Sequence, residues 1–241
     1  MYLNKISELT DEEIQIIIFL EKYTSGKWTF NKKTGLVDIE GNFYCDNKKL
    51  KDFKGVKFGV VTGNFGCHNN SLTSLEGAPQ EVGGCFYCYD NSLTSLEGAP
   101  KEVKGYFYCS HNKLTSLEGA PQEVGVGFNC SDNKLTSLEG APKEVGGGFD
   151  CSDNKLTSLE GAPQVVEGIF WCDGNPISKE TLSLVFKTMH EKKLDYWIAL
   201  SLLKSEILTR DFKKLEGELE KRISKDAQKG ISMLDRFKVF D

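Results

Sequence analysis

The sequence lacks any hydrophobic segment long enough to cross a membrane. Its longest apolar run, Ile16 to Leu20, ends at Glu21 and Lys22, whereas a membrane-spanning helix needs about 18 or more apolar residues. The first residues also lack the basic segment, apolar core and small-residue cleavage site of a secretory signal. We therefore expect a soluble protein of the cytoplasm, in which cysteines stay reduced.

Arginine is missing from the middle of the chain. Residues 65–177 contain 6 lysines, no arginine and 15 acidic residues, a net charge of −9, whereas residues 1–64 carry +1 and residues 178–241 carry +3. Binding to nucleic acid depends mainly on neutralising phosphate charges, which an acidic region repels. The charge therefore excludes nucleic acid as the expected partner and favours a protein partner with a basic or polar surface.

What the middle of the chain does have is an internal repeat. Seven of the eight cysteines are spaced by 22 and then by 21 residues, at positions 45, 67, 88, 109, 130, 151 and 172. A phenylalanine lies two residues before each of them. An asparagine lies three residues after the last six, at Asn70, Asn91, Asn112, Asn133, Asn154 and Asn175. The central units read Phe-x-Cys-x-x-Asn-x-Leu-Thr-Ser-Leu-Glu-Gly-Ala-Pro. A fixed period of this length indicates a solenoid of stacked coils, here about seven.

The repeat resembles the leucine-rich-repeat family, with phenylalanine and cysteine in two of the leucine places of Leu-x-Leu-x-x-Asn-x-Leu. The period of 21 is most similar to the short repeats of secreted bacterial effectors, whose convex side is extended rather than helical. The repeated sequence Leu-Thr-Ser-Leu-Glu-Gly-Ala-Pro also resembles that of repeat proteins of tailed bacteriophages, which suggests a viral origin. The resemblance implies an α+β repeat fold: a leucine-rich-repeat solenoid with a parallel concave sheet. It covers residues 41–177.

The spacing gives each repeated residue a place in the coil. Side chains alternate along a strand, so Phe86 and Cys88 point to one face and Tyr87 and Tyr89 to the other. Stacked coils then align the phenylalanines in one buried ladder. The asparagines lie where the chain leaves the strand, and a buried amide there must pair with backbone groups. We therefore predict that the six asparagines form a structural ladder.

The cysteines in this register invite a disulfide or metal interpretation. A reduced cysteine behaves as a small buried hydrophobe, and a column of equivalent positions spreads thiols along a line instead of gathering them around one metal ion. We expect a buried column without metal or cofactor. Cys85 and Cys88 differ by three positions and should therefore point to opposite faces, which leaves Cys85 as the one exposed cysteine.

The outward positions of the strands differ from coil to coil. They place an aromatic cluster in the middle of the concave face, followed by an acidic stretch. The candidate binding residues are Tyr87, Tyr89, Tyr106, Tyr108, His111, Asp132, Asp150, Asp153, Trp171 and Asp173. Tyrosines on a rigid sheet are typical of recognition hot spots. The alternative is that an exposed strand face favours aromatic residues for cross-strand packing alone.

A catalytic interpretation can rest only on His111, which lies beside Ser110 and has Asp90 and Asp132 as column neighbours. A serine, histidine and aspartate could form a triad, and the acidic column could hold a divalent cation. However, adjacent side chains usually diverge, and an open sheet offers no water-excluding pocket. We therefore expect no catalytic residue, and a solvated edge instead of a metal site.

The flanking segments are expected to cover the ends of the solenoid. In residues 1–40, Thr10 to Glu13 is a capping box that opens a helix ending near Tyr23, followed by a hairpin from Trp28 to Ile39. Residues 178–241 contain apolar residues at helical spacing and are expected to form a C-terminal helical region. The expected organisation is an N-terminal cap at 1–40, the solenoid at 41–177 and a helical cap or domain at 178–241.

These observations favour a protein-binding module that is not an enzyme. The resemblance to phage repeat proteins implies one use, which is to engage or inhibit a host bacterial protein, such as a defence component. A structural protein of the virion or its assembly is the alternative, and a sponge for small molecules or nucleotides is a third.

Overall fold

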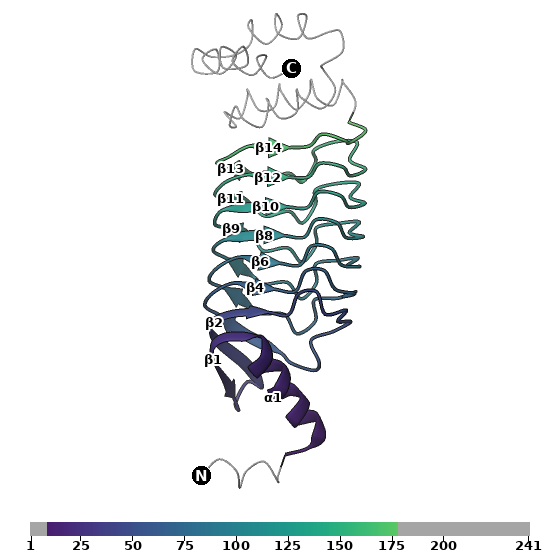
Figure 1. The fold of residues 1–241 in the computed structure, drawn as a ribbon. Helices are drawn as coiled ribbons and strands as arrows, with labels where there is room; N and C mark the ends of the chain where they lie inside the picture. The colour runs from purple at the N-terminus through teal and green to yellow at the C-terminus, as the bar shows by residue number, and fades with distance from the viewer. Residues whose placement is uncertain (1–8, 178–241) are drawn as a thin grey trace, which may run out of the picture.

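The computed structural model describes residues 9–177, which form a parallel β-solenoid with one helix at its N-terminal end (Figure 1). Two columns of short strands run up the stack and form one 14-stranded sheet that is joined through β2. The solenoid predicted from the repeat is therefore confirmed, with seven strands in one column and six in the other, which make about six complete turns where about seven were expected. The expected C-terminal helices lie outside the described residues. No helix among residues 9–177 is long and apolar enough to span a membrane.

The N-terminal helix α1 covers Asp11–Tyr23, and Thr10 caps it. The Thr10 side chain accepts the N–H of Glu13, and the Glu13 carboxylate accepts the N–H of Thr10, which is the predicted capping box. Strands β1 (Thr24–Asn31) and β2 (Leu36–Tyr44) then form an antiparallel hairpin, as predicted but longer. Because β2 also pairs with β3 and β4, the hairpin is continuous with the sheet of the coils across residue 40.

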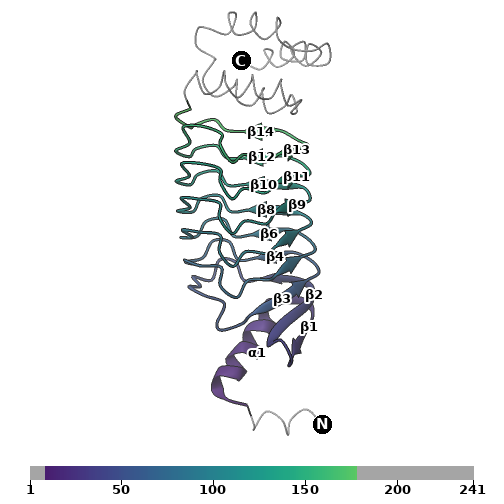
Figure 2. The same ribbon diagram turned by 180° about the vertical axis from the view of Figure 1, so that it is seen from behind.

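The strands after the hairpin alternate between the two columns. The first column contains β2 and the phenylalanine strands β4 (Phe65–Gly66), β6 (Phe86–Tyr87), β8 (Tyr106–Tyr108), β10 (Gly127–Asn129), β12 (Phe149–Asp150) and β14 (Phe170–Trp171). The second column contains β3 (Phe58–Val61), β5 (Glu81–Val82), β7 (Glu102–Val103), β9 (Glu123–Val124), β11 (Glu144–Val145) and β13 (Val165–Val166). Figure 2 shows the stack from behind, with the second column on the other flank of each coil.

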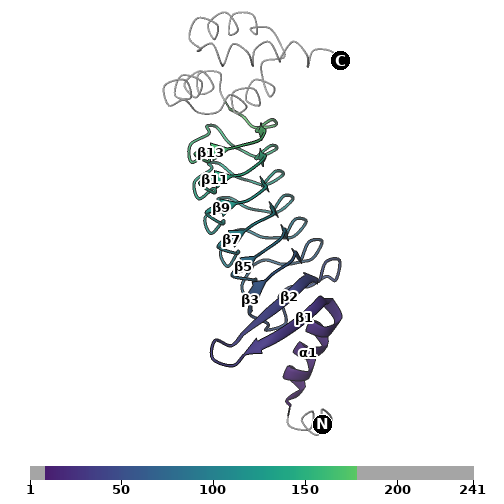
Figure 3. The same ribbon diagram turned by 90° about the vertical axis from the view of Figure 1, so that its left-hand side faces the viewer.

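The second column agrees with the extended, non-helical convex side that the resemblance implied, but its strand pairing was not predicted, and it affects the shape of the solenoid. A solenoid curves when its two sides repeat at different distances. Here both sides consist of parallel strands, which repeat at the same spacing of about 4.8 Å. Accordingly, the described coils stack along an almost straight axis (Figure 3). The face expected to be concave is therefore close to flat.

A ladder of phenylalanine rings fills the centre of the coils. Neighbouring rings stack nearly parallel, with centroids 5.5 Å apart for Phe65 and Phe86 and 5.2 Å apart for Phe107 and Phe128. At the N-terminal end, Phe19 of α1 lies 5.5 Å from the ring of Phe43, so the helix packs against the end of the ladder. The seven repeated cysteines are fully buried beside the rings, and no disulfide joins cysteines within residues 9–177.

The asparagine ladder is also confirmed. The Asn133 amide donates to the carbonyls of Cys109, Cys130 and Ser131, each at 3.1 Å, and its oxygen accepts the N–H of Leu114 at 2.9 Å. Asn70, Asn91, Asn112, Asn154 and Asn175 make the same contacts in their own coils. Each asparagine therefore joins its coil to the preceding one.

Two kinds of glycine allow the coils to turn and to stack. Gly98, in the Leu-Glu-Gly-Ala-Pro turn, has φ 86°, a left-handed conformation that strains other residues. Gly147, just before a strand, has no such conformation. A Cβ there would lie 2.0 Å from the carbonyl oxygen of Val126 in the preceding coil, so only glycine permits this close stacking.

Candidate binding face

The candidate site is the outward side of the phenylalanine strands together with the two residues that follow each cysteine, which we call the tyrosine–aspartate face. Parallel register places Tyr87 next to Tyr108, and Asn129 next to both Tyr108 and Asp150. Alternation along each strand turns these side chains outward while the phenylalanines face the core. The predicted burial of the phenylalanines and cysteines is confirmed, whereas Ser110, Ser131 and Ser152, which were expected to face outward after their cysteines, are buried.

Three of the four predicted tyrosines form one stack. The rings of Tyr87 and Tyr108 lie 5.7 Å apart at an angle of 18°, and those of Tyr106 and Tyr108 lie 5.3 Å apart at 10°. Tyr106 is 40% exposed. Burial raises the pKa of Tyr108, so this phenol stays neutral across the physiological range. The stack provides a rigid, partly apolar surface with polar hydroxyl groups.

The fourth tyrosine, Tyr89, has a different partner. It stacks on His68 of the preceding coil, with ring centroids 4.4 Å apart. His Nε2 lies 3.8 Å from the Asp46 carboxylate, and its buried Nδ1 has no hydrogen-bond partner. His68 was not among the predicted site residues. The signal was available, because His68 and Tyr89 occupy the same position after their cysteines.

Some aromatic side chains cover glycines of a neighbouring coil. A Cβ on Gly66 would lie 2.6 Å from the ring of Tyr44, and one on Gly148 would lie 2.6 Å from the ring of Trp171. Gly127 is covered in the same way by Tyr106. Cross-strand packing therefore explains part of the aromatic content, as the alternative interpretation expected. The rings of Tyr87 and Tyr89 are not among the nearest atoms to any glycine of the face, so this packing does not explain them.

Cys85 lies among these rings, half-buried, whereas Cys88 is fully buried as predicted. The Cys85 sulfur accepts the backbone N–H of Tyr106 at 3.4 Å. A hydrogen bond with Cys85 and, secondarily, burial raise the pKa of Tyr87. The Cys85 thiol therefore contacts Tyr87 of its own coil and the backbone of Tyr106 in the next coil.

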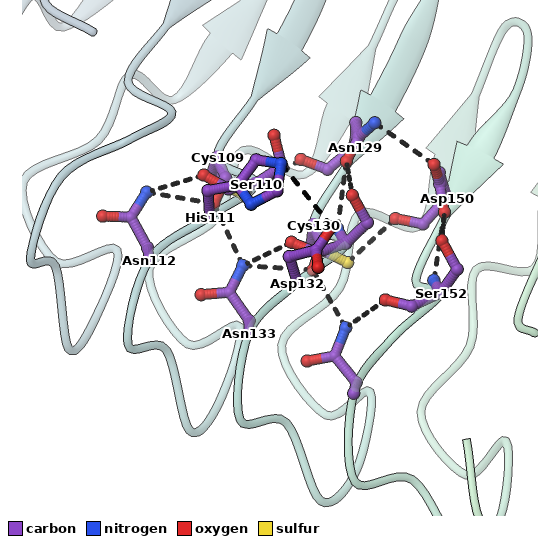
Figure 4. A network of polar contacts seen from close by, with 12 residues as sticks. Cys109, Ser110, His111, Asn112, Asn129, Cys130, Asp132, Asn133, Asp150 and Ser152 are labelled. Atoms are coloured by element: carbon purple, nitrogen blue, oxygen red, sulfur yellow. Dashed lines mark hydrogen bonds and ion pairs between the residues drawn. The ribbon is translucent and has the colours of Figure 1, made fainter. Parts of the chain in front are cut away.

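Beyond the tyrosines, the face becomes polar and acidic (Figure 4). The Asp150 carboxylate accepts hydrogen bonds from the Asn129 amide at 3.2 Å and from the Ser152 backbone N–H at 3.0 Å. Asn129 makes the equivalent bond with Ser131, at 2.9 Å. Asp150 is thereby held in a fixed position at the centre of the acidic stretch. Trp171 is 41% exposed at the end of the face, and Asp173 is exposed beside it.

The column that contains His111, Asp132 and Asp153 has a backbone reason for its composition. These residues have φ of 51°, 53° and 52°, and Asn47, Asn69 and Asp90 in the same column are also left-handed. Asparagine, aspartate and histidine tolerate this conformation better than other residues that have a side chain. The turn therefore accounts for the choice of residue type. The side chains remain exposed, so they can still contact a partner.

The residues of the catalytic interpretation do not meet as a triad. His111 Nε2 lies 3.6 Å from the Asp132 carboxylate, with the histidine side chain 55% exposed. Ser110 is buried, and among the hydrogen bonds of the described residues none joins its side chain to His111. Burial and, next, the charges of Asp132 and Asp173 raise the pKa of Asp153. No group of three or more potential ligands converges on a metal site within residues 9–177.

A separate groove lies between the turns of successive coils. It is lined by parts of residues 74–80 and 95–101 together with Leu36, Lys57 and Phe58. None of the predicted binding residues lines it. Both lysines and glutamates line the groove, so its charge does not indicate one class of ligand.

Comparison of the chain with protein-family models, with curated proteins and with solved structures finds no match. The relation to leucine-rich repeats therefore rests on the repeat pattern alone.

Proposed function

We propose that the protein is a non-enzymatic binding module that recognises a protein partner through the tyrosine–aspartate face. The observation that carries the proposal is the stack of Tyr87, Tyr106 and Tyr108, which is held rigid by the sheet beneath it. Rigid tyrosines lose little conformational entropy on binding and present both apolar and hydrogen-bonding surface. The tyrosines are also followed by acidic residues that favour a basic or polar partner.

The partner class follows from the size of the face. Seven strands at about 4.8 Å give a length of roughly 30 Å, and about four residues at 3.3 Å give a width of roughly 13 Å. The outline is about 400 Å², half of the roughly 800 Å² that a standard interface takes from each partner. A protein partner would therefore also contact the rim of the coils. In line with the resemblance to phage repeat proteins, we propose a host bacterial protein, with a defence component as the leading candidate.

The test is capture of a partner from bacterial lysate with the full chain, followed by titration calorimetry. Replacing Tyr87 and Tyr108 with alanine should weaken binding by about 2 kcal/mol or more, because desolvated aromatic contacts dominate interfaces. The matched control is Thr94→Ala with Thr115→Ala, which changes two exposed turn residues of the same two coils. Unchanged affinity in the folded tyrosine variant would move the binding site off this face. Recovery of the chain with purified particles would favour a virion component instead.

A further inference from the structure

We infer that the side chain recognised by the tyrosine–aspartate face is arginine, presented by a protein surface that carries several of them. This inference rests on the proposed function and specifies its chemistry. It follows from the distribution of charge, from carboxylates that have no lysine or arginine partner among the described residues, and from the place where the tyrosine stack ends.

Positive residues are excluded from this face. The face consists of the residues three and one before each cysteine and one and two after it, across seven coils. Of these 28 residues, six are aspartates and none is lysine or arginine. The same seven coils contain 11 lysines, at other positions of the repeat. Because lysine is common on the rest of the coil surface, the face differs from its surroundings in sign of charge.

Within residues 9–177, no lysine or arginine forms an ion pair with a carboxylate of the face. The ion pairs found in residues 9–177 are the two that histidines make, His68 with Asp46 and His111 with Asp132. Asp150 is held by neutral donors. Burial and, next, the charges of the nearby Asp132, Asp173 and Asp150 raise the pKa of Asp153. A cationic partner would relieve this repulsion.

The tyrosine stack ends next to the acidic stretch. In the coil after Tyr106 and Tyr108, the same positions are occupied by Gly127 and Asn129, and Asp150 follows in the next coil. No ring continues the stack there. A flat cationic group placed over Asn129 would meet the tyrosine stack on one side and the Asp150 carboxylate on the other.

Arginine fits this position better than lysine. Its guanidinium is planar, stacks on aromatic rings and donates paired hydrogen bonds to carboxylates, whereas the ammonium of lysine is a compact and strongly hydrated charge. A lysine would be attracted by the aspartates, but it would gain little binding energy from contact with the tyrosine stack. A preference for arginine over lysine at equal charge is therefore the specific consequence of this arrangement.

The probe is a fluorescein-labelled peptide of nine residues with alternating arginine and serine, which spans about 30 Å when extended. Two matched peptides replace arginine by lysine or by its neutral analogue citrulline. Anisotropy titration of the full chain at about 150 mM salt should give binding at least about fivefold tighter for arginine than for lysine, because only arginine stacks. The citrulline peptide should show no measurable binding.

Three folded variants separate site from bulk charge. The first variant changes Asp132, Asp150 and Asp153 to asparagine and should lower the affinity for the arginine peptide about tenfold. The second variant changes Glu102, Glu123 and Glu144 to glutamine, which removes the same charge from the second strand column. It should lower the affinity for the arginine peptide less than about threefold. Tyr87→Leu with Tyr108→Leu should abolish the preference for arginine over lysine.

The inference would be overturned by equal affinity for the arginine and lysine peptides. It would also be overturned if the aspartate and glutamate variants lost affinity for the arginine peptide to the same extent. The proposed function has its own readout, which is the loss of the captured protein partner in the tyrosine variant. If that partner is lost while the peptides show no arginine preference, the face binds protein by other chemistry. If the peptides behave as expected but the partner still binds the tyrosine variant, the proposed function is wrong at this face.

Discussion

The two outward surfaces of the solenoid differ in how much they change from coil to coil. On the second strand column, glutamate recurs at positions 81, 102, 123 and 144, and the turn Leu-Thr-Ser-Leu-Glu-Gly-Ala-Pro is identical in five coils. On the tyrosine–aspartate face, one position carries Tyr87, Tyr108, Asn129, Asp150 and Trp171 in successive coils. Each coil has nearly the same backbone, so the same residues can support the backbone of every coil and the scaffold itself requires no variation. Variation on one side only is what a surface for specific recognition requires.

The core of the coils is also repeated, with a cysteine in each coil. The largest effect is expected at high pH, which tests whether these cysteines are buried. Burial raises the pKa of the Cys45 thiol to about 12 and raises the pKa values of Cys67, Cys88, Cys109, Cys130 and Cys151. Unfolded thiols ionise near pH 8.5, so the unfolded state loses protons first as pH rises. Stability should be constant below about pH 8 and then fall by about 1.4 kcal/mol per pH unit for each thiol.

The measurement is urea unfolding of the reduced protein from pH 7 to pH 10. Six thiols acting together should remove about 8 kcal/mol per pH unit above pH 8.5, which is comparable to the whole stability of an ordinary domain, so the protein should unfold before pH 10. The control is Cys109→Ala with Cys130→Ala, whose stability should fall less steeply with pH because two ionising groups are gone. A stability that does not change up to pH 10 would contradict the buried cysteine column.

A smaller effect is expected for a single member of the asparagine ladder. Asn133→Ala leaves the Leu114 N–H and three carbonyl groups without their amide partner. Unpaired buried polar groups should lower the free energy of unfolding by about 1–3 kcal/mol. Lys134→Ala, at the exposed neighbouring position, should change it by less than about 0.5 kcal/mol. Thermal unfolding compares the two variants, and equal melting temperatures would refute a structural role for the ladder.

Most of the interior could be predicted from the sequence, because each interior residue type recurs at a fixed spacing. Phenylalanine, cysteine and asparagine each define a column, because stacking coils at this period brings equivalent residues next to one another. The helix and hairpin were also predictable, since Thr10 with Glu13 and the turn at residues 31–35 are local signals. These features depend on residues that are close in the sequence or related by the period.

The second strand column could not be predicted in the same way. Its strands β5, β7, β9, β11 and β13 contain two residues each, too few for an alternating pattern to be visible. Glycines follow most of them, which is more typical of a turn. Parallel pairing between coils, which no single coil reveals, creates the strands. The expectation of a concave face failed for the same reason.

The candidate face could be predicted by position but not by contact. The four tyrosines were placed on one side, yet the sequence did not show that Tyr89 pairs with His68 while the other three stack together. The left-handed column could have been recognised, because asparagine, aspartate, histidine and glycine are the residues that such a backbone favours. Its composition was instead ascribed to function.

The most direct test of the account transplants the outward residues of one coil onto two others. Tyr87→Asn, Tyr89→Ser and Tyr108→Asn give the coils of β6 and β8 the residues that the coil of β10 carries at Asn129 and Ser131. The backbone already accepts these residues at equivalent positions, so the melting temperature should shift by no more than about 5 °C. Titration calorimetry with the captured partner should show affinity reduced at least about thirtyfold, or about 2 kcal/mol. A variant that unfolds, or one that is folded and binds as before, would contradict the division between a repeated scaffold and a variable binding face.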